Sequence, residues 1–249
     1  MQKWAWMALA GVVALTGCGG SDDDDDVGQL FRERTGIYFH NQLIDTSGSG
    51  TEQADTTVDV VLRNDVSAPL FEGREYSTTE QDGMGFKLES DTETVLFDIN
   101  NATATLVDDT GINLAAGENY TLVLYGALAG SGDQIPKLKA YQQSVESIGT
   151  SQVRVRFIHA LADEADQNID ISLEGSSVVS GLEYGTVSAY KVGGLSSATT
   201  LTASLKVGSA SAVDRSCAIE LGKSYDAIIA HPAPDSTGIA LYCQQVAGS

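Results

Sequence analysis

The sequence predicts an all-β chain in which two tandem β-sandwich domains follow a signal peptide and an acidic tether. Short apolar segments are separated by glycine-containing turns, since the 249 residues include 26 Gly but only 4 Pro. No segment after residue 30 keeps a helical period over three turns. The same order of short motifs also occurs twice along the chain. We therefore expect two copies of one domain that is built from short strands.

Residues 1–17 have the features of a signal peptide. Lys3 provides a positive charge, and the apolar segment 4–15 is too short to span a bilayer as a helix. The sequence Leu15-Thr16-Gly17-Cys18 resembles the lipobox of bacterial lipoproteins. We therefore expect Cys18 to be acylated, to become the mature N-terminus and to anchor the protein to a membrane through its lipid.

Residues 18–28 read as the acylated cysteine followed by a disordered acidic tether. Asp22–Asp26 place five carboxylates next to one another, and their repulsion favours an extended spacer. The acidic segment could also keep the folded part away from an anionic membrane or serve an export machinery. Gly19 is not the Asp that resembles an inner-membrane retention signal. This favours the outer membrane of the cell envelope, with the folded part either periplasmic or surface-exposed.

The composition excludes one class of partner. The chain has 14 Lys and Arg against 34 Asp and Glu, and its net charge of −20 repels phosphate backbones. We therefore expect no nucleic-acid binding. With 42% hydrophobic residues the chain is too apolar for general disorder.

Five blocks of sequence recur in the same order. The pairs are Ile37–Asn41 with Arg156–Ala160, Val58–Leu62 with Ile169–Leu173, Gly73–Tyr76 with Gly181–Tyr184, Gly117–Tyr120 with Gly222–Tyr225, and Leu138–Gln143 with Ala240–Gln245. This alignment gives His40 and His159 the same position. We infer a first domain at residues 29–146 and a second at residues 150–249, with the polar segment 142–151 as a hinge.

Each copy reads as an immunoglobulin-like or transthyretin-like sandwich. Val153–Phe157 and Ile169–Leu173 alternate apolar and polar residues, as half-buried strands do. About 100 residues with seven or eight short strands fit this class. We expect Leu122–Tyr125 and Ala227–Ala230 to form central strands. Tyr184 and Tyr190 are read as packing residues rather than as a binding face.

Copy two also resembles a known family. It contains His159-Ala160, Ile169-Asp170-Ile171, the stretch Tyr184–Tyr190 and the turn Gly222–Tyr225. Together these motifs are similar to domain-of-unknown-function family 4397, although the loop prolines of that family are missing. Copy one is more divergent. The resemblance implies an extracytoplasmic bacterial β-sandwich module and does not imply a reaction.

The candidate chemistry is sparse. A metal site needs three or four converging ligands, and neither His40 nor His159 has a second His or Cys nearby in sequence. We expect each of the two to bond backbone in the following loop, and we expect His231 to be a loop residue. The common hydrolase and metalloprotease motifs are absent from the sequence. We therefore predict no catalytic residue, cofactor or metal site.

An acidic loop keeps one alternative open. Asp166, Asn168 and Asp170 are spaced like the first ligands of a calcium loop, but Ile171 and Ser177 stand where Gly and Glu are needed. A looser calcium site remains compatible with the sequence.

The favoured function is a non-enzymatic surface module with a protein or polysaccharide partner or a structural role. The alternatives are a calcium-dependent adhesin-like module and a hydrolase with an unrecognised site. The sequence indicates no oligomeric state.

Two cysteines remain once Cys18 carries lipid. Cys217 and Cys243 lie 26 residues apart, in segments that read as strands of copy two. The cell envelope is an oxidising compartment in which such thiols pair. We therefore expect a disulfide between Cys217 and Cys243.

Overall fold

The computed structural model describes residues 33–45, 56–63, 68–195, 197 and 199–249. The predicted signal peptide, Cys18 and the predicted acidic tether lie outside these residues. Within the described part the chain forms sixteen strands and two short 3-10 turns, η1 (Gly132–Gln134) and η2 (Ala162–Glu164). None of its described helices has the length and apolar character needed to cross a bilayer.

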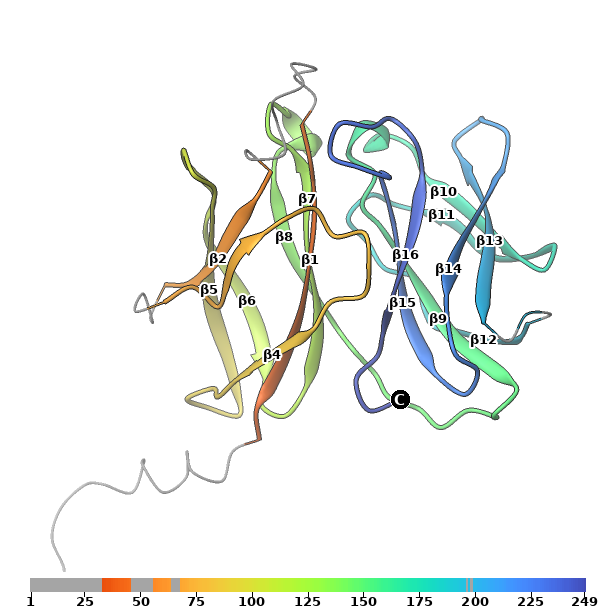
Figure 1. Ribbon diagram of the computed structural model, residues 1–249, viewed down its shortest axis with the longest axis horizontal. Helices are drawn as coiled ribbons and strands as arrows, with labels where there is room; N and C mark the ends of the chain where they lie inside the picture. Colours follow the sequence, from red (N-terminus) through yellow and green to blue (C-terminus); the bar gives the residue numbers. More distant parts are fainter. Residues whose placement is uncertain (1–32, 46–55, 64–67, 196, 198) are drawn as a thin grey trace, which may run out of the picture. The chain divides into compact units, whose positions relative to one another are not determined.

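Eight strands belong to each copy (Figure 1). Those of copy one are β1 (Thr35–Ile44), β2 (Val58–Leu62), β3 (Phe71–Arg74), β4 (Gly83–Phe86), β5 (Thr92–Asn100), β6 (Thr105–Ala115), β7 (Asn119–Ala127) and β8 (Lys137–Gln142). Those of copy two are β9 (Gln152–His159), β10 (Ile169–Leu173), β11 (Ser176–Leu182), β12 (Lys191–Gly194), β13 (Thr200–Val207), β14 (Val213–Ala218), β15 (Ser224–Ala230) and β16 (Ala240–Gln245).

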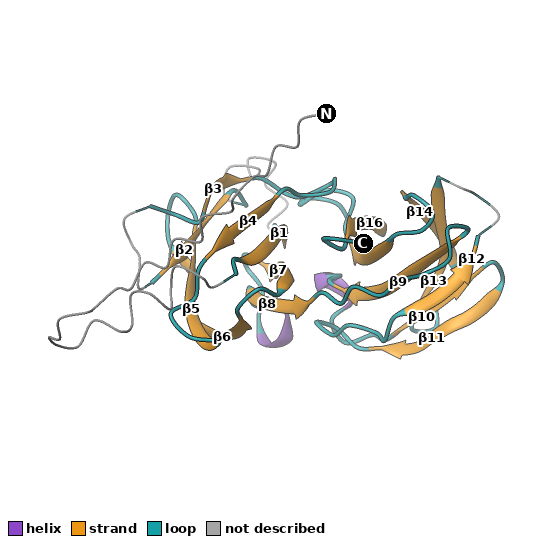
Figure 2. Cartoon of the chain, turned by 90° about the horizontal axis from the view of Figure 1, so that it is seen from below, coloured by secondary structure: helices purple, strands orange, loops and turns teal. Residues whose placement is uncertain are grey.

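The two copies have the same topology. Copy one has sheets ordered β4-β1-β7-β8 and β3-β2-β5-β6, and copy two has β12-β9-β15-β16 and β11-β10-β13-β14. Adding eight to each label of copy one gives copy two. Figure 2 shows the two sheets of each sandwich as separate layers. The all-β class and the internal repeat are therefore confirmed, and the central strands predicted at 122–125 and 227–230 lie in β7 and β15.

Each sandwich has its own hydrophobic core between its two sheets. In copy one the core includes Phe39, Phe97 and Leu122, all nearly inaccessible to solvent. In copy two it includes Phe157 and Leu205. These residues come from alternate positions along their strands, because successive side chains of a strand point to opposite faces.

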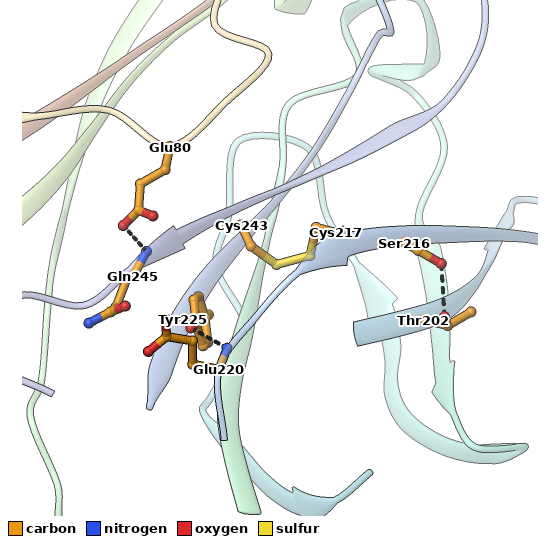
Figure 3. Close-up of a disulfide and its surroundings, with 8 residues drawn as sticks. All are labelled: Glu80, Thr202, Ser216, Cys217, Glu220, Tyr225, Cys243 and Gln245. Atoms are coloured by element: carbon orange, nitrogen blue, oxygen red, sulfur yellow. Dashed lines mark hydrogen bonds between the residues drawn. A yellow bond between two sulfur atoms is a disulfide. The ribbon is translucent and has the colours of Figure 1, made fainter. Parts of the chain in front are cut away.

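The recurring Gly-x-x-Tyr motif has the same structural role in both copies. Gly117 and Gly222 adopt φ values of +80° and +81°, a conformation that glycine reaches without strain. The hydroxyl of Tyr120 accepts a hydrogen bond from the amide of Ala115 at 2.9 Å. That of Tyr225 accepts one from Glu220 at 2.7 Å (Figure 3). The motif therefore fixes the turn that precedes the central strand.

The strand register corrects the predicted pairing of the two histidines. Ile37 lies opposite Tyr120 in copy one, and Val155 lies opposite Tyr225 in copy two. Counting along each strand from these pairs, His40 corresponds to Ile158, and Asn41 corresponds to His159. The sequence alignment was therefore wrong by one residue in this strand, which places the side chain on the opposite face of the sheet.

The last strand of each copy shows a similar shift. Gln142 lies opposite Tyr120, and Gln245 lies opposite Tyr225. Gln142 therefore corresponds to Gln245, whereas the sequence alignment paired it with Gln244.

A disulfide joins the two sheets of copy two. Cys217 of β14 and Cys243 of β16 are bonded, with their Cα atoms 5.7 Å apart (Figure 3). β14 belongs to one sheet of the sandwich and β16 to the other. The bond therefore attaches the C-terminal strand to the opposite sheet.

The segment predicted as a hinge is bonded to the fold. Gln143 is buried and donates a hydrogen bond to the hydroxyl of Thr121 at 3.0 Å. Its side-chain oxygen accepts one from the amide of Ala247 at 2.9 Å. This part of the segment therefore connects β7 of copy one with the C-terminus of copy two.

Candidate functional site

A third cluster of buried side chains lies between the two sandwiches. Residues Arg32–Ser249 form one compact unit. Within it, β7 and β8 of copy one meet β9 and β15 of copy two through a cluster that contains Val123, Tyr125, Tyr141, Ile158, Ala160, Ile228 and Ala230. We call this layer the interface. It explains why β15 is buried along its whole length and β7 along all but its first residue, as continuous apolar strands are.

A buried ion pair lies in the interface. Asp226 is fully buried and accepts hydrogen bonds from Arg156 at 2.6 and 2.9 Å. It also accepts bonds from the hydroxyls of Thr121 at 2.6 Å and Tyr190 at 2.9 Å. Burial opposes the charge of Arg156, but the hydrogen bonds and charge of Asp226 outweigh it and raise the pKa of the guanidinium. Four donors satisfy the carboxylate, so this pair supports the fold.

His40 is also part of the interface. Its side chain is fully buried, and Nε2 lies 2.8 Å from the side-chain oxygen of Gln244 in copy two. The expectation that His40 bonds backbone in the following loop was therefore wrong. Burial lowers the pKa of His40 to about 4, although the bond to Gln244 and the charge of Asp226 work against this. His40 is therefore neutral at pH 7.

His159 behaves as the sequence predicts. Its Nε2 lies 3.1 Å from the backbone oxygen of Gln167 in the following loop, and its Nδ1 accepts a bond from the amide of Leu161 at 3.3 Å. Burial lowers its pKa to about 4. In copy one Asn41 plays the same part, because its side chain bonds the amide of Leu43 and the backbone oxygen of Thr56.

His231 was predicted to be a loop residue, and in the structure its side chain is buried and contacts a carboxylate. Its side chain is fully buried, and Nε2 lies 3.1 Å from a carboxylate oxygen of Asp163. Its backbone oxygen accepts bonds from the hydroxyls of Tyr76 at 2.8 Å and Tyr242 at 2.9 Å. Because Tyr76 belongs to copy one and Tyr242 to copy two, His231 links both copies.

The two tyrosines considered as a binding face are packing residues. The ring of Tyr184 contacts Tyr125 edge-on, with centroids 5.1 Å apart, and His159 at 5.4 Å. Tyr190 donates to Asp226, and the guanidiniums of Arg154 and Arg156 lie over its ring. Both tyrosines therefore pack against other residues of the fold and do not form a separate binding face.

The acidic loop of copy two supplies structural contacts. Asp170 accepts hydrogen bonds from the amide of Gly181 at 2.9 Å and from Ser180 at 3.0 Å, and these bonds lower its pKa. Asp59 bonds Gly73 in the same way in copy one. The aspartate of this strand motif therefore anchors the neighbouring edge strand, while Asp163 faces His231.

One group of three carboxylates was missed by the sequence analysis. Asp98, Asp108 and Asp109 come together where β5 and β6 pair irregularly, and they form the one such cluster with metal-ligand spacing among the described residues. Arg63 makes ion pairs with all three, at 3.8 Å to Asp98 and 3.0 Å to Asp108. The positive guanidinium of Arg63 therefore offsets part of the negative charge of the three carboxylates.

The surface of the described chain contains several cavities. One of about 650 Å³ is lined by Gly117, Glu118, Asn119 and residues 142–145. Another of about 420 Å³ lies beside Phe86 of copy one, with Arg34, Lys87 and Glu93 among its lining residues. Cavities of this size are large enough for small ligands.

Comparisons with known proteins add little to this geometry. No protein-family model matches the chain, and no curated protein matches it. A solved structure of family 41 carbohydrate-binding modules from streptococcal virulence factors, described for α-glucan recognition, is 12% identical with a TM-score of 0.24. Another, of α-glucan binding by a streptococcal virulence factor, is 13% identical with a TM-score of 0.23. Each match covers 85% of this chain and 97% of the other. The similarity is weak at these identities and TM-scores.

Proposed function

We propose that the chain is a lipid-anchored module of the bacterial cell envelope that binds a protein or polysaccharide partner, or builds envelope structure, without catalysing a reaction. The signal peptide and the lipobox-like sequence before Cys18 support the anchor. Gly19 supports residence at the outer membrane. The Asp22–Asp26 segment would then be a spacer between the lipid and the two sandwiches.

The burial of the reactive side chains carries the non-catalytic part of this proposal. His40, His159 and Asp226 have no exposed surface, and each bonds another part of the fold. An acid–base group must come within hydrogen-bond distance of its substrate. These side chains instead hold strands and loops in place.

We also infer that each copy is an immunoglobulin-like or transthyretin-like sandwich and that both are related to domain-of-unknown-function family 4397. The motifs behind that resemblance have structural roles in this chain. Tyr225 fixes a turn, Asp170 anchors an edge strand, and Tyr190 bonds the buried Asp226. Side chains with such roles are expected to recur in proteins that share the fold.

The anchor is tested by Cys18→Ala. We expect the wild-type protein to fractionate with outer membranes, and the variant to become soluble or to stay unprocessed, because the variant lacks the lipid. Fractionation of cells followed by immunoblotting measures this, with Ser21→Ala in the tether as control. A Cys18→Ala protein that remains in the outer-membrane fraction to the wild-type extent would refute the lipoprotein assignment.

A further inference from the structure

The cavity of about 650 Å³ is lined by polar groups that the fold leaves free. Glu118 and Asn119 come from the turn before β7 and its first residue, and Gln142 ends β8. Among the described residues, no hydrogen bond engages the side chains of these three. Two amides and a carboxylate are thus available to a ligand. Amides both donate and accept, and a carboxylate accepts, which suits a ligand rich in hydroxyl groups.

An aromatic ring lies beside Asn119. Tyr38 of β1 pairs with Gly83 of β4, and a Cβ atom at Gly83 would lie only 2.6 Å from the Cζ atom of the ring. A Cβ atom at Gly36 would lie 2.1 Å from the side-chain oxygen of Asn119 and 3.7 Å from the Tyr38 ring. Glycine at both positions therefore lets the ring and the amide lie side by side on one face of the sheet. Tyr38 remains partly exposed.

The charge of the cavity restricts its ligand. Its lining includes Glu118 and no Lys or Arg, and the whole chain has a net charge of −20. An anionic ligand would therefore be repelled. The free polar groups make a wholly apolar ligand unfavourable, because its binding would remove them from water without replacement bonds.

We propose that this cavity binds a neutral saccharide, with Asn119 and Glu118 bonding sugar hydroxyls and the Tyr38 ring contacting an apolar sugar face. The inference rests on the proposed binding function and names the ligand class for it. An apolar surface beside a few placed polar groups is the usual construction of a small-molecule site. The cavity belongs to copy one and the segment after β8, and within the part of the chain that the structure describes, the Asn119 side chain that we assign to the ligand makes no hydrogen bond to the buried ion pair.

Binding of neutral hexasaccharides tests the proposal. The acylated protein would be purified in a zwitterionic detergent, because detergents with sugar headgroups could occupy the cavity. Maltohexaose, cellohexaose, laminarihexaose and mannohexaose are titrated by isothermal calorimetry, and hexagalacturonate serves as the anionic probe. We expect at least one neutral probe to bind and hexagalacturonate not to bind.

Two variants localise the binding. Asn119→Ala and Tyr38→Leu should each weaken it about tenfold, as expected for the loss of roughly 1.4 kcal/mol. Tyr38→Phe should keep it, because the ring remains. Asn168→Ala makes the same chemical change as Asn119→Ala on an exposed loop of copy two, and it should leave the affinity unchanged.

Three outcomes would overturn the proposal: no neutral probe binds, only hexagalacturonate binds, or Asn119→Ala and Tyr38→Leu both bind with wild-type affinity. Failure here is distinguishable from failure of the proposed function. If no saccharide binds but Cys18→Ala releases the protein from membranes, the envelope assignment stands. If saccharide binds but Cys18→Ala does not alter fractionation, the ligand assignment stands.

Discussion

At the scale of single residues, His40 shows how the interface uses a group that could otherwise carry chemistry. Its imidazole is fully buried, and Gln244 from the other copy satisfies Nε2. Adding a proton would place an uncompensated charge in this layer, because the nearby Asp226 is already paired with Arg156. The folded state is therefore more stable when His40 is neutral than when it is protonated.

This burial predicts a loss of stability in mild acid. The pKa of His40 falls from 6.5 to about 4 on folding, so between these pH values the unfolded chain binds a proton that the folded chain does not. The stabilising contribution is complete above pH 6.5 and is lost as the pH falls toward 4. His40→Gln should reduce the pH dependence of the unfolding free energy by up to about 1.4 kcal/mol per pH unit, the value for one full proton, and by roughly 2 kcal/mol in total between pH 7 and pH 5.

Urea unfolding at pH 7 and pH 5 measures this effect. Lys191→Gln is a suitable control, because it removes a charge at an exposed position of β12 and should keep the wild-type slope. An unchanged slope in His40→Gln would show that His40 does not control acid stability.

Asp226 and Arg156 form a buried ion pair, and the energetic effect of such a pair depends on whether both members are present. Such a pair contributes little net stability compared with apolar residues, but removal of one member leaves a buried charge without its partner and costs about 3–5 kcal/mol. Thr121 is the copy-one residue that bonds Asp226. This bond ties the pair to the contact between the copies.

At the scale of strands, periodicity predicted the short strands and their repeated order, but it did not fix the register. The sequence aligned His40 with His159 because the two residues are identical. The structure aligns the core residues Phe39 and Phe157 instead, so that Asn41 matches His159. Period two identifies a strand, whereas its register depends on which face is buried.

Other parts of the candidate site could not be predicted from sequence for a different reason. The bond between His40 and Gln244 joins residues 204 positions apart, and no local pattern relates them. Likewise, Asp98 meets Asp108 and Asp109 only because β5 and β6 pair with an irregular register. The cysteine pair could be predicted because the sequence has only three Cys, one of which was assigned to a lipid, and because an oxidising compartment was expected.

We expect the disulfide to stabilise the folded state, because it closes a loop that includes the C-terminal strand. It closes a loop of 26 residues between β14 and β16, for which loop-closure entropy predicts about 3–4 kcal/mol. We expect Cys217 and Cys243 peptides to appear linked in mass spectra of the non-reduced protein. Reductant should lower the unfolding free energy by that amount.

The double variant Cys217→Ser/Cys243→Ser provides the control. It should match the reduced wild type in stability and should not respond to reductant. Recovery of both cysteines as free thiols from the purified, non-reduced protein would contradict the pairing.

At the scale of the whole molecule, each copy has its own core and both share the interface. Strands β7 and β15 are buried on both faces, and separation of the copies would expose the apolar cluster and the ion pair to water. We therefore infer that the two sandwiches unfold as one cooperative unit, although each has the complete topology of a single domain.

Native-state hydrogen exchange in the wild type and in Asp226→Ala tests this coupling most directly. β5 and β13 are suitable reporters, since each lies in the sheet of its copy that does not form the interface. Coupling predicts that Asp226→Ala, a change in copy two, lowers the opening free energies of β5 and β13 equally, by about 3–5 kcal/mol. If β5 kept its wild-type protection while β13 lost it, the copies would be independent domains and the account would be contradicted.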